Sequence, residues 1–245
     1  MGQLIILCGP SCAGKTPLKK AISRFFPDLY KNLIPLIPYN SRPPRPGEKN
    51  GIDFFFRDYN QISQLRHDKS YAVITVHNDL QAINLIELRH LANNNDVFYE
   101  GNTHVGRFLQ SEGALQDLPK KSVFLSPLSA KNITILKKQK EVSLKESIEK
   151  LMRSKIIRRA NRLGIKKDDH FLVDTNKRAA DAFIELKEGW HFDHIIPNPD
   201  GEESAHWTAD TYPIAAAGEA LTAFAAILQN KPHPLIEIWD EKLVA

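Results

Sequence analysis

The sequence predicts an α/β fold in which a central parallel sheet is flanked by helices. Two observations predict it. Strand-like and helix-like segments alternate along the 245 residues, and a glycine-rich loop joins the first strand to the first helix. Ligands of such sheets bind where strands end and helices begin. We expect one domain over residues 1–231, with two excursions at about 36–92 and 130–190, and a C-terminal extension over 232–245.

Composition excludes several classes of protein. The chain is 42% hydrophobic and 25% charged, which is ordinary for a globular domain that buries a core. Apolar runs are too short for a membrane span or a secretory signal, and Cys8 and Cys12 give no disulfide framework. The net charge of +4 suits an anionic small ligand but is too weak to indicate nucleic acid. We therefore expect a cytoplasmic protein without a membrane partner.

Local patterns set the expected elements in chain order. Alternation or β-branched runs predict strands at 3–8, 71–76, 97–100, 122–126 and 192–198. Helical spacing predicts a helix after residue 14, which carries Leu18, Ala21, Ile22 and Phe25, and further helices at 58–67, 80–92, 129–140, 143–163, 175–187 and 214–228. The segment 232–239 is expected to form an edge strand or an oligomer contact.

The loop after the first strand matches a phosphate-binding pattern, G-x-x-x-x-G-K-[ST]. Its members are Gly9, Pro10, Ser11, Cys12, Ala13, Gly14, Lys15 and Thr16. Glycines allow backbone N–H groups to surround phosphate oxygens, and the helix N-terminus attracts the same anion. Lys15 would reach the β- and γ-phosphates of ATP, and the Thr16 hydroxyl would ligate Mg²⁺. Cys12 is expected to be a small loop residue, with a reactive thiol as the alternative.

A second anion site is predicted in the proline-rich segment 41–56. Arg42 and Arg45 lie three residues apart between prolines, which stiffen the loop. Planar guanidinium groups match phosphate geometry well. The alternative is an exposed turn with solvated arginines.

These two motifs resemble those of the guanylate kinase family, which pairs a GPSGxGK-[ST] loop with a segment like SxTTRxPRxGExxGxDYxF. The resemblance is strong over residues 3–16 and 41–56 and weaker at 97–102, 146–148 and 192–198. It implies a P-loop kinase that transfers the γ-phosphoryl group of ATP to a nucleoside monophosphate, with Mg²⁺ as cofactor. It also implies an acceptor-binding flap at about 36–92 and a lid, with an insertion, at about 130–190.

Several positions depart from the family's acceptor site. Phe54 stands where the family has a phosphate-binding tyrosine, beside Ser41 and the two retained arginines. The base-reading serine, glutamate and aspartate of the family fall, by counting, at Pro38, about Tyr71, and Asn102. The family's GNYYG run is replaced by residues 77–81. Loss of base-reading groups should change acceptor choice. We therefore expect an acceptor other than GMP, or GMP read in another way.

Other candidate residues follow from position. Glu100 ends a buried strand and is a candidate acceptor contact that could also orient Mg²⁺; alternatively, it could act as a helix cap or a surface acid. Asn102 and His104 follow on what we expect to be a loop and are candidate acceptor contacts. Asn198 and Asp200 could lie beside the adenine of ATP, although Pro-Asp-Gly is also a turn signal.

The resemblance implies that lid arginines neutralise the transferring phosphoryl group. Arg153 aligns best with that role, followed by Arg158 or Arg159, but a charged run is commonly a solvated helix face. His191 and His194 beside Asp193 suggest a metal site, which the opposite directions of adjacent strand residues disfavour.

Two rival functions remain open from the sequence. The chain could be a non-catalytic guanylate-kinase-like binding module, which the intact Gly14-Lys15-Thr16 disfavours. It could also phosphorylate a phosphosugar or a nucleic-acid end, which the basic helix at 143–163 keeps open. The expected partners are small nucleotides, nucleic acid is not expected, and the chain would be a monomer or a homodimer.

Overall fold

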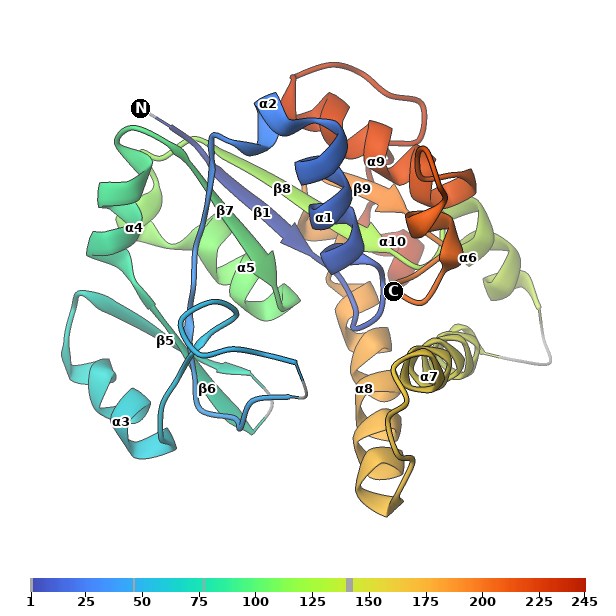
Figure 1. Cartoon of the computed structure of the whole chain (residues 1–245), viewed down its shortest axis with the longest axis horizontal. Coiled ribbons are helices and arrows are strands. Elements are labelled where there is room, and N and C mark those ends of the chain that lie inside the picture. Colours follow the sequence, from blue (N-terminus) through green and yellow to red (C-terminus); the bar gives the residue numbers. More distant parts are fainter. Residues whose placement is uncertain (1, 46, 77, 140–142) are drawn as a thin grey trace. The chain divides into compact units, whose positions relative to one another are not determined.

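A five-stranded sheet forms the centre of the fold, as the sequence predicts (Figure 1). The structure is a computed structural model that describes residues 2–45, 47–76, 78–139 and 143–245. Within these residues the strand order is β2-β7-β1-β8-β9, and the pairs β2–β7 and β8–β9 are parallel. The strands are β1 (Leu4–Cys8), β2 (Leu33–Pro35), β7 (Asp96–Gly101), β8 (Lys120–Ser126) and β9 (His194–Pro197). The predicted strands at 3–8, 97–100, 122–126 and 192–198 are thus confirmed.

The chain divides into two compact units, which are described separately. The first unit comprises Met1–Ile6 and Asn32–Ser122, and the second comprises Leu7–Lys31 and Val123–Ala245. No helix in the described part of the chain is both long enough and apolar enough to cross a bilayer.

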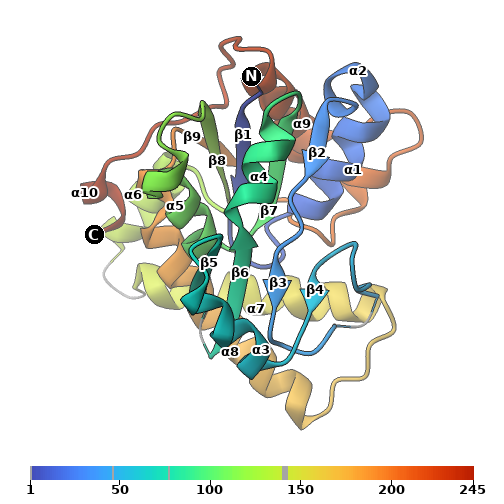
Figure 2. The same ribbon diagram turned by 90° about the vertical axis from the view of Figure 1, so that its left-hand side faces the viewer.

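The first unit holds a second sheet with the strand order β4-β3-β6-β5 (Figure 2). Its strands are β3 (Tyr39–Asn40), β4 (Phe55–Phe56), β5 (Tyr71–Val76) and β6 (Asp79–Asn84). One face packs on α3 (Tyr59–Gln64), where buried Ile62, Leu80 and Ala82 form a cluster. Asp58 begins α3 with a capping box, and η1 (Leu65–His67) continues it. The predicted helix at 58–67 and strand at 71–76 are confirmed.

The predicted helix at 80–92 is wrong over its first half. Residues Asp79–Asn84 are strand β6, and only α4 (Leu85–Ala92) is helical. Leu80, Gln81, Ala82 and Ile83 are all buried, because β6 is covered on both faces. A strand of this kind shows no two-residue alternation, so its apolar residues merge with the helical spacing that follows. Asn84 marks the change, since its Oδ1 accepts from the N–H groups of Ile86 and Glu87.

The prediction of a loop after residue 101 is also wrong. Residues Thr103–Ser111 form α5, which buries Val105, Gly106 and Leu109, and η2 (Gly113–Leu115) follows. Asn102 is the N-cap of α5, because its Oδ1 accepts from the His104 N–H at 2.8 Å. Asn102 and His104 therefore lie on a helix N-terminus.

The second unit packs helices around β8 and β9. Helix α1 (Lys15–Phe25) follows the glycine-rich loop and buries Leu18, Ala21 and Ile22, with Pro17 in its first turn. The remaining elements are α2 (Pro27–Tyr30), α6 (Ala130–Lys138), η3 (Gly189–His191), η4 (Ala205–Thr208), α9 (Ala215–Leu228) and α10 (Glu241–Val244). The predicted helices after residue 14 and at 129–140 and 214–228 are confirmed within these bounds, while Lys140 lies outside the described residues.

Two long helices of this unit lie side by side (Figure 1). Helix α7 (Leu144–Arg162) begins with a capping box of Ser143 and Glu146, and α8 (Asp169–Lys187) begins at Asp168, whose carboxylate accepts from the Phe171 N–H. The predicted helices at 143–163 and 175–187 are confirmed. The segment 164–190, within the expected lid and insertion, is thus mainly the second of these two helices.

The segment 232–239 pairs with the sheet at a single position. Glu237 and Ile195 exchange two backbone hydrogen bonds of 2.8 and 2.9 Å. Trp239 is 4% exposed, its ring centre lies 6.2 Å from that of Phe124, and its Nε1–H donates to the Glu237 carboxylate. The C-terminal segment therefore belongs to the core of the second unit.

We predict that Trp239→Ala lowers the free energy of unfolding by about 3–5 kcal/mol, because it removes a large buried side chain and leaves a cavity. The neighbouring Ile238 is 82% exposed, so Ile238→Ala is the matched control and should change stability by less than about 0.5 kcal/mol. Urea denaturation measures both. Equal effects of the two variants would contradict this account of the C-terminal segment.

Candidate functional site

The phosphate loop, residues 9–16, adopts a backbone that needs its glycines. Gly9, Cys12 and Gly14 have φ angles of 143°, 65° and 103°. A Cβ at Gly9 would lie 2.3 Å from the Leu125 carbonyl oxygen, and one at Gly14 would lie 2.6 Å from the Asn198 Nδ2. Both sites therefore require a residue without a side chain. The loop leads directly into the N-terminus of α1, where the helix dipole favours an anion.

Lys15 and Thr16 begin α1. The Lys15 ammonium group donates to the carbonyl oxygens of Gly9 at 2.6 Å and Pro10 at 3.0 Å, so it lies beside the opening residues of the phosphate loop. Thr16 is exposed at the helix N-terminus. A lysine and a hydroxyl next to backbone N–H groups are the groups that bind the phosphates of a nucleotide and its Mg²⁺.

Sequence reasoning missed Arg178, which contacts the phosphate loop from α8. Its Nε–H donates to the Ser11 Oγ at 3.1 Å, its Nη2 donates to the same oxygen, and Nη2 also lies 3.7 Å from the Cys12 Sγ. Asp174 lies one helical turn earlier and pairs with Arg178 at 3.4 Å. The arginine side chain is 12% exposed. No local motif marks Arg178, because its position depends on the packing of α8.

The surroundings of Cys12 disfavour the reactive-thiol alternative. Burial raises the pKa of the Cys12 thiol above its usual value, and the opposing effect of the Arg178 charge is smaller. A raised pKa reduces the thiolate fraction, which is the nucleophilic form. Cys8 and Cys12 are both buried free cysteines.

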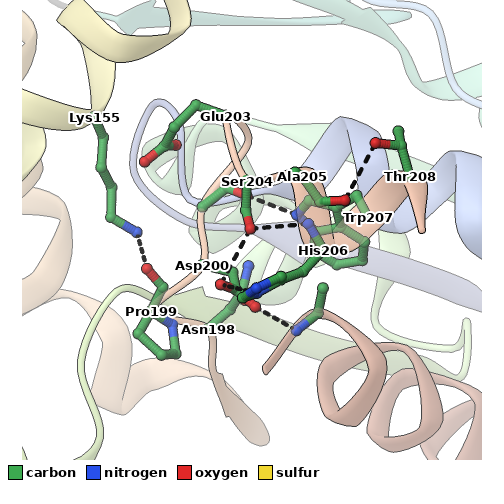
Figure 3. A network of polar contacts seen from close by, with 12 residues as sticks. Lys155, Asn198, Pro199, Asp200, Glu203, Ser204, Ala205, His206, Trp207 and Thr208 are labelled. Carbon is green, nitrogen blue, oxygen red and sulfur yellow. Dashed lines mark hydrogen bonds and ion pairs between the residues drawn. The ribbon is translucent and has the colours of Figure 1, made fainter. Parts of the chain in front are cut away.

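The loop from residue 198 to 208, whose internal contacts Figure 3 shows, also donates hydrogen bonds to the phosphate loop. The Asn198 Nδ2 donates to the Ala13 carbonyl oxygen at 2.7 Å, and the Glu202 N–H donates to the Cys12 carbonyl oxygen at 3.1 Å. The Trp207 Nε1–H closes this loop by donating to the Gly201 carbonyl oxygen at 2.6 Å. Asn198 is thus a direct support of the phosphate loop.

Asp200 has its carboxylate committed to the loop itself. Oδ1 lies 2.7 Å from the His206 Nδ1 and accepts from the Ser204 hydroxyl at 3.1 Å, as Figure 3 shows. Oδ2 accepts from the Ala217 N–H at 2.8 Å in the first turn of α9. These contacts agree with the turn-forming interpretation of Asp200.

The basic residues of α7 face the acidic residues of the same loop. Arg158 pairs with Glu203 at 2.8 Å, and Arg159 pairs with Glu202 at 3.0 Å. Arg153, the arginine favoured by the family resemblance, is exposed on α7. Within the second unit, therefore, Arg178 contacts the phosphate loop directly, whereas Arg158 and Arg159 are held by carboxylates beside it.

Lys155 is a buried cation that sequence reasoning passed over. It is 1% exposed, and its ammonium group donates to the Pro199 carbonyl oxygen at 2.6 Å (Figure 3). Burial lowers the pKa of Lys155, and the nearby Glu203 carboxylate opposes that shift. Lys155 thereby ties α7 to the loop that supports the phosphate loop.

In the first unit, the predicted arginine clamp is organised by Glu48. The Glu48 carboxylate accepts two hydrogen bonds from the Arg42 guanidinium, at 2.6 and 2.7 Å, and one from the Arg45 N–H at 2.7 Å. Burial raises the pKa of Glu48, but the hydrogen bonds from Arg42 and Arg45 outweigh it and leave the pKa below its usual value. The Arg42 Cζ lies 5.1 Å from the ring centre of Phe54, so the residue in place of tyrosine stacks near the guanidinium.

The remaining predicted acceptor residues take different positions in this unit. The Ser41 hydroxyl accepts from the Leu80 N–H at 2.8 Å and so joins the loop to β6. Tyr71 packs with the Ile62 cluster, on the face of the second sheet that contacts α3. Glu100 lies near the end of β7, and Asn102 follows as the N-cap of α5. The Tyr71 side chain therefore lies on the α3 face of the second sheet. The side chains of Asn40 and Gln81, which alternate with those of Tyr39 and Ala82, lie on the opposite face.

The described residues fit a magnesium ion carried by nucleotide phosphates. Among the described residues, no three or more His, Cys, Asp and Glu side chains lie close enough together to hold a metal ion. This applies also to His191, Asp193 and His194. Mg²⁺ in kinases is commonly held by one or two protein oxygens together with substrate phosphates. Thr16 at the start of α1 supplies such an oxygen next to the phosphate loop.

Comparison with known proteins connects the N-terminal part of the chain to one family. A family model described as guanylate kinase matches residues 1–83. The guanylate kinase of Synechococcus sp. (strain JA-3-3Ab) is 36% identical over 64 residues, which cover 26% of this chain and 28% of that protein. The guanylate kinase of Nostoc sp. (strain PCC 7120 / SAG 25.82 / UTEX 2576) is 39% identical over 64 residues, 26% of this chain and 30% of that protein. These alignments thus span less than a third of either relative.

Comparison of structures extends over nearly the whole chain. The crystal structure of guanylate kinase from Anaplasma phagocytophilum aligns with a TM-score of 0.53 and 15% sequence identity, covering 94% of this chain and 85% of that chain. At this identity the likeness concerns the fold. Residues 1–83 are thus similar to guanylate kinases in sequence, and the fold of the chain resembles that of a guanylate kinase.

Proposed function

We propose that the chain is an ATP-dependent kinase that transfers a phosphoryl group to the phosphate of a nucleoside monophosphate. The observation that carries this proposal is the phosphate loop of the second unit, with Lys15 on its carbonyl oxygens and Arg178 on Ser11. Phosphoryl transfer depends mainly on positive charge and backbone N–H groups held around the phosphates. A binding module without catalysis has no need of this full set.

Each residue has a separate role in the proposed mechanism. The phosphate loop binds the β- and γ-phosphates of ATP, and Lys15 compensates their charge. Mg²⁺, when bound through Thr16 and the phosphates, would neutralise charge on the transferring group. Arg178 would stabilise the charge that develops on the equatorial oxygens. This assignment prefers Arg178 to Arg153, Arg158 and Arg159, because Arg178 contacts Ser11 of the phosphate loop, whereas Arg158 and Arg159 contact Glu203 and Glu202.

The acceptor would bind through its phosphate to Arg42 and Arg45. Glu48 holds both residues of this clamp in place before any ligand binds, which lowers the entropy lost on binding. The Arg42 guanidinium still has donors beyond those that Glu48 uses. Glu100 and Asn102 remain candidate acceptor or magnesium contacts. Exclusion of water by the lid would limit hydrolysis of ATP.

We predict that Lys15→Ala lowers kcat by about 10²–10³-fold, because the ammonium compensates charge that grows in the transition state. Lys20→Ala, an exposed lysine on the same helix, is the control and should leave kcat unchanged. Release of ADP with a panel of nucleoside monophosphates measures the effect. A chain that binds MgATP but transfers phosphate to none of them would instead support the binding-module alternative.

We predict that Arg178→Ala lowers kcat by about 10²-fold and raises the KM for ATP less strongly, since the guanidinium would act on developing charge. Lys177→Ala removes an exposed charge from the preceding position of α8 and should have wild-type kinetics. Steady-state kinetics with varied MgATP separate kcat from KM. Equal kinetics of the two variants would assign Arg178 to structure alone.

We predict that Arg42→Ala raises the KM for the acceptor about tenfold or more, because it removes the planar cation that would bind the acceptor phosphate. The KM for ATP should stay constant. Arg66→Ala, at an exposed arginine of the same unit, is the control. An unchanged acceptor KM in Arg42→Ala would refute the arginine clamp.

A further inference from the structure

Two carboxamide side chains are buried side by side in the second sheet of the first unit. Asn40 on β3 is 1% exposed, and Gln81 on β6 is 6% exposed. The two residues are cross-strand partners in the antiparallel pair β3–β6. Because directly opposed residues project from the same face, both amides leave the sheet on one side.

Two polar atoms of this amide pair have no hydrogen-bond partner among the described residues. The Asn40 Oδ1 accepts from the Arg42 N–H at 3.2 Å. The Asn40 Nδ2 and the Gln81 Oε1 are both buried, and neither has a hydrogen-bond partner among the described residues. Buried polar atoms without partners are rare and unfavourable, so two on adjacent residues call for an explanation. One atom is a donor and the other an acceptor.

The amide pair adjoins the proposed phosphate clamp and lies away from the hydrophobic cluster. The residues Tyr39, Val73, Leu80 and Ala82 pack toward Ile62 of α3, so the alternate residues Asn40 and Gln81 belong to the opposite face. Phe56, the neighbour of Asn40 on β4, lies with its ring centre 5.6 Å from the Arg42 Cζ. A ligand whose phosphate bound Arg42 would therefore have its remaining groups near the amide pair.

We infer that Asn40 and Gln81 read the base of the acceptor. This inference rests on the proposed function and names the specificity residues of its acceptor site. The Asn40 Nδ2 donates to, and the Gln81 Oε1 accepts from, a planar ring edge that presents a hydrogen-bond acceptor beside a donor. Ionised carboxylates accept only and therefore select an edge with donors alone. A neutral amide pair selects a mixed edge, and it costs no desolvation of a charge.

The decisive variant is Gln81→Met, which keeps the length of the side chain and removes the unpartnered oxygen. Of AMP, CMP, GMP and UMP, the one that the wild-type chain binds most tightly should bind the variant about tenfold or more weakly. The ratio of its affinity to that of the second-best nucleotide should also fall. Affinity for MgATP should not change. The Tm should stay equal or rise, because a buried acceptor without a partner is lost. A purely structural glutamine would give a lower Tm and an unchanged base preference.

Two further variants sharpen the test. Gln110→Met on α5 is the matched control, since Gln110 Nε2 is also buried without a partner, and it should leave the preference unchanged. Asn40→Asp keeps the oxygen that accepts from Arg42 but turns the donor into an acceptor, so the preferred base should lose its advantage. Calorimetry on the whole chain gives the binding constants, and ADP release with MgATP gives the matching kcat/KM values.

The outcomes separate the inference from the proposed function. If both Gln81→Met and Asn40→Asp keep the wild-type ranking of the four nucleotides, the inference is overturned even when phosphoryl transfer is observed. If the nucleotides bind with a ranking that these variants alter but no transfer occurs, the inference stands and the kinase proposal fails. If the wild-type chain binds none of the four, both are overturned.

Discussion

The phosphate loop of the second unit and the loop that supports it depend on one constraint, which is that residue 14 has no side chain. Asn198, Trp207 and Gly201 occupy the positions around this Cα, with the Asn198 Nδ2 only 2.6 Å from where a Cβ would lie. This close approach lets the Asn198 amide hold the Ala13 carbonyl oxygen. The loop that follows Asn198 then carries the acidic groups that receive the cations of α7. The phosphate loop, the loop at 198–208 that supports it, and α7 are thus joined by one continuous series of contacts.

The sequence predicted those parts of the fold whose signal is local. The glycine-rich loop between strand and helix, the buried strand before it and the helices predicted at 58–67 and 143–163 each depend on neighbouring residues, and these elements are confirmed. Strand β6 was predicted as helix, because burial on both faces removes the alternation that identifies a strand. Helix α5 was missed after the strand end at Gly101, where a buried Gly106 weakens the helical pattern.

The candidate site was less predictable than the fold, because side chains from distant segments complete it. Arg178 lies 167 residues from Ser11 along the chain, and only the packing of α8 brings their side chains together. The amide pair has the same origin, since Asn40 and Gln81 become neighbours through the register of β3 and β6. Counting positions from a motif aligns residues with those of the family, but it does not show on which face of a sheet their side chains lie. Tyr71 illustrates this, because its side chain belongs to the face packed on α3.

The Cys12 thiol lies at the contact between the phosphate loop and α8. Its sulfur is buried beneath the Arg178 guanidinium, and both burial and a raised pKa keep it from reacting with electrophiles. Because Arg178 of α8 contacts both Ser11 and Cys12, a movement of α8 away from the loop would change the surroundings of this sulfur and withdraw the arginine together. The rate at which a thiol reagent modifies Cys12 would therefore report on the contact between α8 and the phosphate loop.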